Sequence, residues 1–256
     1  MVFLRSIEPI ENYCAFLWLN ENRKAVEESQ EFLDVLTENA HLLCHKASEP
    51  SFVLEQKLTA LHMVIGEKNI DSILDNVTAG LNDSKLSSSS HSHLIYFLTT
   101  INSEFHEKCQ DVFRRLLTID SEKLSVTLLS SIHHFISSDD PLMKDYAHRV
   151  LPLWKSLNQS QLLVLMQLSA QFAHESPGSR PHMHSLADYV CSTACHSTVV
   201  KCELMSTLVA CFRAQPAEYL AVLKQCLMKF RDSASEVLSE QAQWCLQQVC
   251  MYITVS

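Results

Sequence analysis

The sequence predicts an all-α protein in which antiparallel helix pairs stack as an α-α superhelix. Three observations predict it: apolar residues recur at helical spacing, helix-start signals are frequent, and glycine is scarce. The 256 residues include three glycines, Gly66, Gly80 and Gly178. Sheet proteins need glycine at hairpin turns and bulges, and α/β nucleotide-binding folds need it where the backbone approaches phosphate. Helix pairs need only short turns, so this composition favours helices.

The apolar residues follow the period of a helix along most of the chain. Val26, Leu33, Leu36, Ala40 and Leu43 follow one another at steps that place them on one helical face. No run alternates apolar and polar residues with β-branched enrichment, so we expect no strands. The predicted helices cover residues 9–20, 23–45, 51–65, 70–81, 93–101, 104–118, 122–136, 141–157, 160–174, 183–195, 198–213, 216–230 and 235–252.

Proline and small polar residues mark the expected helix starts. Pro9, Pro50, Pro141 and Pro216 each open an apolar-periodic stretch, where the missing N–H of proline is not needed. Pro152 lies inside a helical pattern and is expected to kink or split it. The side chains that could cap a helix by accepting from an unpaired backbone N–H are Ser48, Ser103, Asp120, Asp140, Ser160, Ser197 and Ser235.

The sequence predicts a single helical-repeat domain over residues 1–256, interrupted by two loops. Residues 82–93 are rich in serine, which buries little area, so we expect a mobile surface linker and a weak joint there. A phosphorylation site is the alternative interpretation of this linker. Residues 175–182 contain proline and glycine and predict a second loop.

Helices of about 15 residues joined by short turns need roughly 40 residues per antiparallel pair. In residues 140–151, Asp140 stands at a turn, and a hydrophobic residue precedes a basic one. Residues 232–242 repeat part of this pattern but lack the basic residue after Val237. These segments resemble the second helix of a HEAT repeat, and residues 121–252 resemble the HEAT/armadillo superfamily most clearly. The resemblance implies a solenoid that grips a protein partner on its concave face, with no fixed binding residues to carry over.

The charge balance argues against nucleic acid and anionic membranes as partners. The net charge is −9 with histidines neutral, whereas nonspecific nucleic-acid binding requires clustered Lys and Arg. A local basic patch of Lys108, Arg114, Arg115 and Lys123 keeps a helical nucleic-acid-binding repeat as an alternative. The apolar run at 13–19 is too short for a membrane span, so we expect none.

The sequence carries no motif of the common enzyme classes. Gly-x-Ser-x-Gly, a phosphate loop and Gly-x-Gly-x-x-Gly do not occur in it. Asp139 and Asp140 are adjacent carboxylates, but at a helix start they are expected to cap the helix. We therefore expect no enzyme activity, no catalytic residues, no cofactor and no small-molecule substrate.

The cysteines and histidines raise the question of a metal site. Cys191, Cys195 and His196 are weak candidate ligands, because two cysteines four apart share a helical face but no Cys-x-x-Cys pair is present. We expect buried thiols and no metal, there and in the segment from 41 to 45. A helical metalloenzyme is the third functional alternative. The cysteines expected to be reduced core thiols, as in a cytosolic or nuclear protein, are Cys14, Cys109, Cys202, Cys211, Cys226 and Cys245.

Both ends of the chain have helices that are apolar nearly all round, at 13–19 and 249–253. Such helices are expected to be buried, so a fragment or isoform of a longer solenoid, or one subunit of a complex, is predicted. The expected function is a non-enzymatic protein-interaction scaffold or subunit of a larger intracellular complex, nuclear or cytoplasmic. Composition suggests genome maintenance or meiosis by analogy, and a trafficking adaptor is a further alternative.

Overall fold

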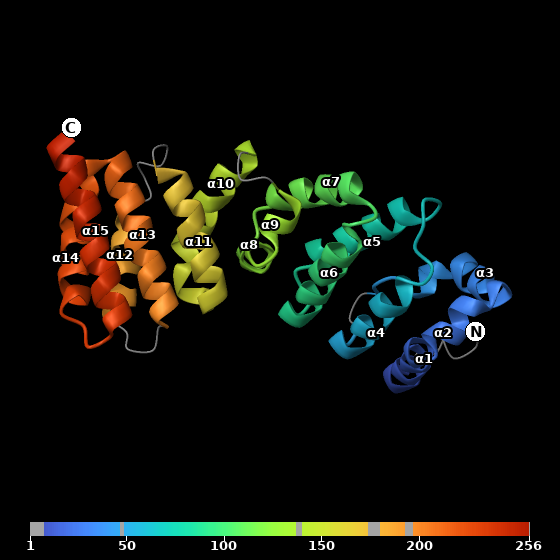
Figure 1. Ribbon diagram of the computed structural model, residues 1–256. Coiled ribbons are helices and arrows are strands. Elements are labelled where there is room, and N and C mark those ends of the chain that lie inside the picture. Colours follow the sequence, from blue (N-terminus) through green and yellow to red (C-terminus); the bar gives the residue numbers. More distant parts are fainter. Residues whose placement is uncertain (1–7, 47–48, 137–139, 174–179, 193–196, 256) are drawn as a thin grey trace. The chain divides into compact units, whose positions relative to one another are not determined.

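The computed structural model describes residues 8–46, 49–136, 140–173, 180–192 and 197–255. The chain forms two compact units, Met1–Ile136 and Ser137–Ser256, which are described separately (Figure 1). Every regular element in the described residues is a helix, and none of these residues lies in a strand. The prediction of an all-α protein is confirmed.

The first unit contains helices of 4 to 14 residues and one short 3-10 helix. Their bounds are α1 (Pro9–Glu21), α2 (Arg23–Glu28), α3 (Gln30–Glu38), η2 (Ala40–Leu42), α4 (Ser51–Leu61), α5 (Ile70–Asn82), α6 (Ser88–Ile101), α7 (His106–Leu117), α8 (Glu122–Leu129) and α9 (Ile132–Phe135).

The second unit contains longer helices toward its C-terminal end. Their bounds are α10 (Pro141–Val150), η3 (Leu151–Ser156), α11 (Gln159–Gln171), α12 (Arg180–Ser192), α13 (Thr198–Ala214), α14 (Pro216–Arg231) and α15 (Glu236–Val255). The 3-10 segment η3 contains Pro152 and follows α10 directly, so the predicted interruption at this proline is confirmed.

Helices in both units pack on adjacent helices such as α13 on α14, and in several cases on helices further along the chain, often next-but-one neighbours. In the first unit α4 contacts α1 and α6, α6 contacts α8, and α5 contacts α7. In the second unit α13 contacts α11 and α15, while α12 contacts α14 (Figure 1). Side-chain hydrogen bonds follow the same rule: the Asn76 amide and His45 backbone are 31 positions apart, and Gln215 and Ala173 are 42 apart. Segments about one helix pair apart along the chain therefore lie side by side.

Helix starts follow the capping rules, with some displacement from the predicted residues. Pro9, Pro141 and Pro216 occupy the first turn of their helices, and the Asp140 carboxylate accepts from the backbone N–H of Leu142 at 3.0 Å. Ser197 caps α13 as predicted. Asn158 caps α11, two residues before the predicted Ser160. The predicted caps Ser48 and Asp139 lie outside the described residues.

One predicted helix and one predicted loop have the wrong bounds. The helix predicted over 23–45 is broken, because Ser29 adopts an extended backbone between α2 and α3. The loop predicted over 82–93 ends at Ser87, whose side chain caps α6 by accepting from the Ser90 N–H at 3.0 Å. Ser90 is 1% exposed, so this small serine is buried within the first unit. In the second predicted loop, residues 175–179 lie outside the described part and Arg180 opens α12.

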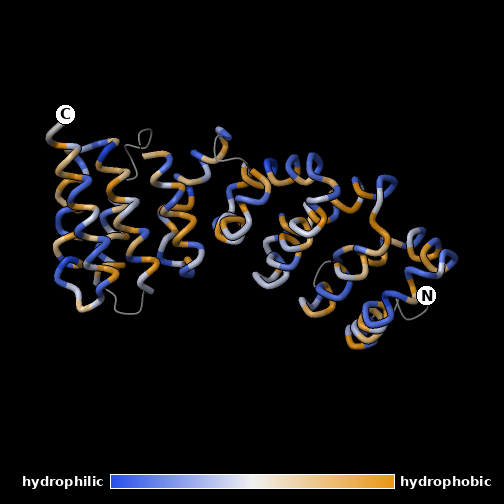
Figure 2. Tube along the Cα trace, in the orientation of Figure 1, coloured by the Kyte–Doolittle hydropathy of each residue, from blue (hydrophilic) through white to orange (hydrophobic). Residues whose placement is uncertain are grey.

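The predicted core face is buried apart from Leu33, which is half-buried. Figure 2 shows apolar residues alternating with hydrophilic ones along the helices, as amphipathic helices require. Cys109, Cys211, Cys226 and Cys245 are buried as predicted, whereas Cys14 is exposed on α1. None of the helices in the described part of the chain combines the length and apolar character needed to cross a bilayer.

Candidate functional site

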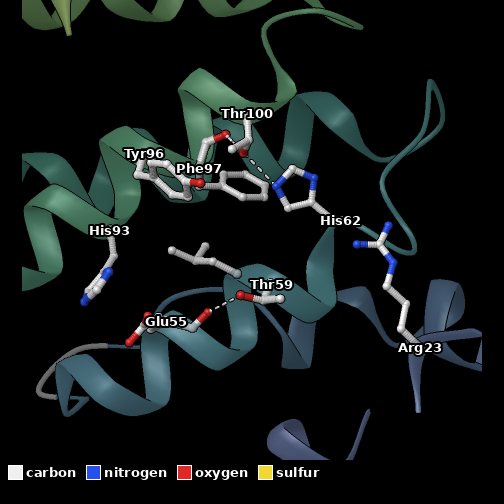
Figure 3. A pocket seen from close by; sticks show the side chains of 9 residues that line it. Arg23, Glu55, Thr59, His62, His93, Tyr96, Phe97 and Thr100 are labelled. Atoms are coloured by element: carbon white, nitrogen blue, oxygen red, sulfur yellow. Dashed lines mark hydrogen bonds between the residues drawn. The ribbon is translucent and has the colours of Figure 1, made fainter. Parts of the chain in front are cut away.

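A groove of about 380 Å³ lies between α4 and α6 in the first unit (Figure 3). The two helices pack against each other, and Arg23 of α2 lies at one end of the groove. The lining residues are Arg23, Glu55, Leu58, Thr59, His62, His93, Tyr96, Phe97 and Thr100.

Two adjacent aromatic residues of α6 have opposite environments at this groove. Phe97 is 2% exposed and belongs to the core, whereas the Tyr96 side chain is 70% exposed. The His62 ring packs on Phe97 edge to face, with ring centroids 5.1 Å apart. Tyr96 therefore presents a large, rigid ring that is exposed at the surface among the described residues of its unit.

His62 and Thr100 form the main polar contact across the groove. The His62 Nε2 atom lies 2.7 Å from Thr100 Oγ1, and the Thr100 hydroxyl donates to the Phe97 carbonyl at 2.7 Å. Because the threonine proton is engaged by the backbone, its oxygen accepts from His62 Nε2–H. Burial lowers the pKa of His62, and the positive charge of Arg23 lowers it further.

The two ends of the groove differ in charge. Arg23 and His62 lie toward one end, and Glu55 and His93 lie toward the other (Figure 3). The Arg23 Nε atom donates to Glu27 at 2.6 Å, and the arginine side chain remains half-exposed. The Glu55 side chain is exposed on α4. This arrangement favours an elongated ligand with an acidic group at the Arg23 end.

Further apolar side chains are exposed on the first and last helices of the chain. Ile10 and Trp18 of α1 are 72% and 55% exposed, so this helix is not buried all round as predicted. On α15, Val237, Trp244 and Met251 are each at least half exposed, and they recur every seven residues. Residues seven apart share a helical face, so these three form an apolar stripe.

Of the three weak candidate metal ligands, one lies in the described part of the chain. Cys191 lies in α12 with its Sγ atom 3.6 Å from Cys226 Sγ, while Cys195 and His196 lie outside the described residues. At the other candidate segment, the Cys44 thiol donates to the Ala40 carbonyl at 3.6 Å. No group of three His, Cys, Asp or Glu side chains in the described part of the chain is arranged to hold a metal ion.

The sequence did not single out the groove residues. The pattern of α6 does not single out Tyr96 either, because adjacent residues of this helix, such as Leu94 and Ile95, are both buried. Neither His62 nor Arg23 carried a signal, since their role depends on helices about 38 positions apart meeting in space. No protein-family model and no curated protein matches this chain.

Proposed function

We propose that this chain is a non-enzymatic protein-interaction scaffold that binds an extended segment of another protein in the groove between α4 and α6. The main observation in support of this function is the exposed ring of Tyr96. Aromatic residues and arginine are enriched at the centres of protein interfaces, because they bury large area at little cost in conformational entropy. Tyr96 and Arg23 are exposed residues of these kinds that line the groove, whereas its other aromatic residue, Phe97, is buried in the core.

The polar groups of the groove support binding rather than catalysis. A nucleophilic threonine needs a base that accepts its proton, but Thr100 already donates that proton to a backbone carbonyl. His62 acts as a donor in this contact, so the pair is not arranged for nucleophilic attack. An aliphatic side chain of the partner would cover the exposed Tyr96 ring, and a partner carboxylate would share the half-exposed Arg23 guanidinium with Glu27.

The basic residues of α7 and its neighbours support a protein partner over nucleic acid. Lys108 forms ion pairs with Asp71 at 3.0 Å and Glu67 at 3.6 Å. Lys123 donates to the Leu86 carbonyl and is thereby directed toward its own unit. Side chains engaged in this way contribute less positive field for phosphate groups. The next-but-one packing supports a stacked helical repeat, whereas the concave binding face, the pathway and the localisation stay predictions.

The proposal is tested by selecting peptides from a displayed 12-residue library on the full chain. Selected peptides should carry an apolar residue and an acidic residue at a fixed spacing. In fluorescence polarisation, Tyr96→Ala should weaken a selected peptide at least about tenfold, as expected for an interface residue that contributes above 1 kcal/mol. Arg23→Glu should weaken acidic peptides and favour basic ones.

Trp244→Ala is the matched control, because it removes an exposed aromatic side chain from α15 in the other unit. This variant should bind the peptides like the wild-type chain. If Tyr96→Ala binds them equally well, or if the library yields no peptide above background, the groove is not a peptide-binding site. Far-UV circular dichroism of each variant establishes that the helices remain folded.

A further inference from the structure

Two cysteines of the second unit face each other from different helices. Cys191 lies in the last turn of α12, Cys226 lies in α14, and the two helices pack together. The sulfur atoms are 3.6 Å apart, although the residues are 35 positions apart in the sequence. A disulfide bond has an S–S length of about 2.05 Å, so an approach of about 1.5 Å would join them.

A small cavity gives access to this pair from solvent. It measures about 40 Å³ and is lined by both cysteines together with Asp188, Ser192 and Lys229. Cys191 is partly exposed, whereas Cys226 is 2% exposed. The cavity admits a molecule about as large as water, which needs about 30 Å³ in the liquid. Hydrogen peroxide is only slightly larger than water, so it is a suitable oxidant for this pair.

The surroundings distinguish the two thiols chemically. Hydrogen bonding to Cys226 lowers the pKa of Cys191, burial opposes this effect, and the positive charge of Lys229 adds to it. Hydrogen bonding to Cys191 and burial raise the pKa of Cys226. The thiolate is the nucleophilic form of cysteine, so Cys191 is suited to attack and Cys226 to act second.

We propose that Cys191 and Cys226 form a peroxide-reactive dithiol that closes to a disulfide between α12 and α14. The Cys191 thiolate attacks one oxygen of hydrogen peroxide, forming an S–O bond as the O–O bond breaks. The departing hydroxide takes a proton from solvent and leaves as water. Cys226 sulfur then attacks Cys191 sulfur, the S–O bond breaks, and the hydroxyl group leaves as a second water with the Cys226 proton. In sum, two thiols are oxidised and one peroxide is reduced to two waters.

The disulfide would tie α12 to α14 across the chain segment that contains α13. Such a link restricts the unfolded chain, so the oxidised second unit should melt at a higher temperature than the reduced one. This inference concerns the second unit and is independent of the groove between α4 and α6.

The test treats the reduced and desalted full chain with one equivalent of hydrogen peroxide and follows each cysteine over time. Remaining thiols are alkylated, and the digest is analysed by mass spectrometry. We expect a peptide linked through Cys191 and Cys226 that dithiothreitol releases, and loss of the Cys191 thiol at least about tenfold faster than loss of the exposed Cys14 thiol. The comparison with Cys14 uses the wild-type chain and needs no variant to fold.

Two variants assign the order of attack. Cys226→Ser should accumulate sulfenic acid at Cys191, detected as a dimedone adduct, whereas Cys191→Ser should form no adduct at Cys226. Cys14→Ser is the matched control and should form the same disulfide as the wild-type chain. Reaction of Cys191 no faster than Cys14, or a mixture of disulfides without the Cys191–Cys226 link, would overturn the proposal.

Discussion

Lys57 and Glu49 form an ion pair inside the first unit, with the lysine Nζ atom 2.5 Å from glutamate Oε1. Their side chains are 1% and 7% exposed. Nζ also lies 3.5 Å from the Cys44 carbonyl and 5.6 Å from the centroid of the Phe16 ring. One ammonium group therefore joins α1, α4 and the segment between η2 and α4. Burial lowers the pKa of Lys57, and Glu49 opposes this shift.

Removing one member of this pair should destabilise the first unit strongly. Lys57→Met leaves the Glu49 carboxylate buried without its counter-charge, which costs about 3–5 kcal/mol for buried pairs. The double variant Lys57→Met/Glu49→Leu removes both charges and should recover most of this loss. Urea unfolding monitored by circular dichroism measures both free energies. A double variant as unstable as the single one would mean that packing around the lysine stem, and not the charge, accounts for the loss.

Acid should destabilise the first unit at pH values below about 6.5. Burial lowers the pKa of His45, His62 and His91 from the ordinary value of 6.5, and Lys123 lowers that of His91 further while Asp83 opposes. The pKa of each histidine is lower in the folded chain than in the unfolded chain. At pH values between these two pKa values, the unfolded chain therefore binds more protons. Stability is therefore greatest above pH 6.5 and falls as the pH decreases through this range.

The urea midpoint measured between pH 8 and pH 5 checks this expectation. His91→Leu should reduce the slope below pH 6.5, because His91 is 2% exposed and its protonated form is disfavoured there. His133→Gln, at an exposed position of α9, should leave the slope unchanged. An unaltered slope in His91→Leu would show that His91 does not contribute to the acid sensitivity.

Gly80 in α5 marks a close approach between α5 and its neighbours. A Cβ atom at this position would lie 2.9 Å from His45 Cδ2 and 2.9 Å from Leu94 Cδ1. Alanine favours a helix over glycine by about 1 kcal/mol, but overpacking a core costs about 1–3 kcal/mol. Gly80→Ala should therefore lower the free energy of unfolding by about 1 kcal/mol in urea titrations.

Gly66 offers the matched control for this substitution. A Cβ atom there would meet nothing within 4 Å, and the residue does not adopt the left-handed conformation. Gly66→Ala should be neutral or stabilise by up to about 1 kcal/mol, since alanine restricts the unfolded chain. Equal effects of the two substitutions would show that the contact with His45 and Leu94 has little energetic weight.

The sequence predicted the helices well because apolar spacing and capping residues act locally. It missed the break at Ser29, because the apolar face of α2 and α3 continues in register across it. It predicted a loop over residues 88–93, which belong to α6, because serine is polar and was expected at the surface. Ser90 is nevertheless buried, since its side chain is small. The candidate site could not be predicted, since the groove and the Cys191–Cys226 contact depend on pairings of distant segments.

The next-but-one packing also determines how a perturbation spreads through each unit. Hydrogen bonds such as His62 to Thr100 and Thr207 to Met166 link positions 38 and 41 apart, so these contacts join helices that are close neighbours along the chain. We therefore expect each unit to respond as a row of coupled neighbours with largely local contacts. Damage in α1 should reach α4 and fade before α8. Hydrogen exchange should then vary stepwise from helix to helix along a unit, in place of one protection level throughout.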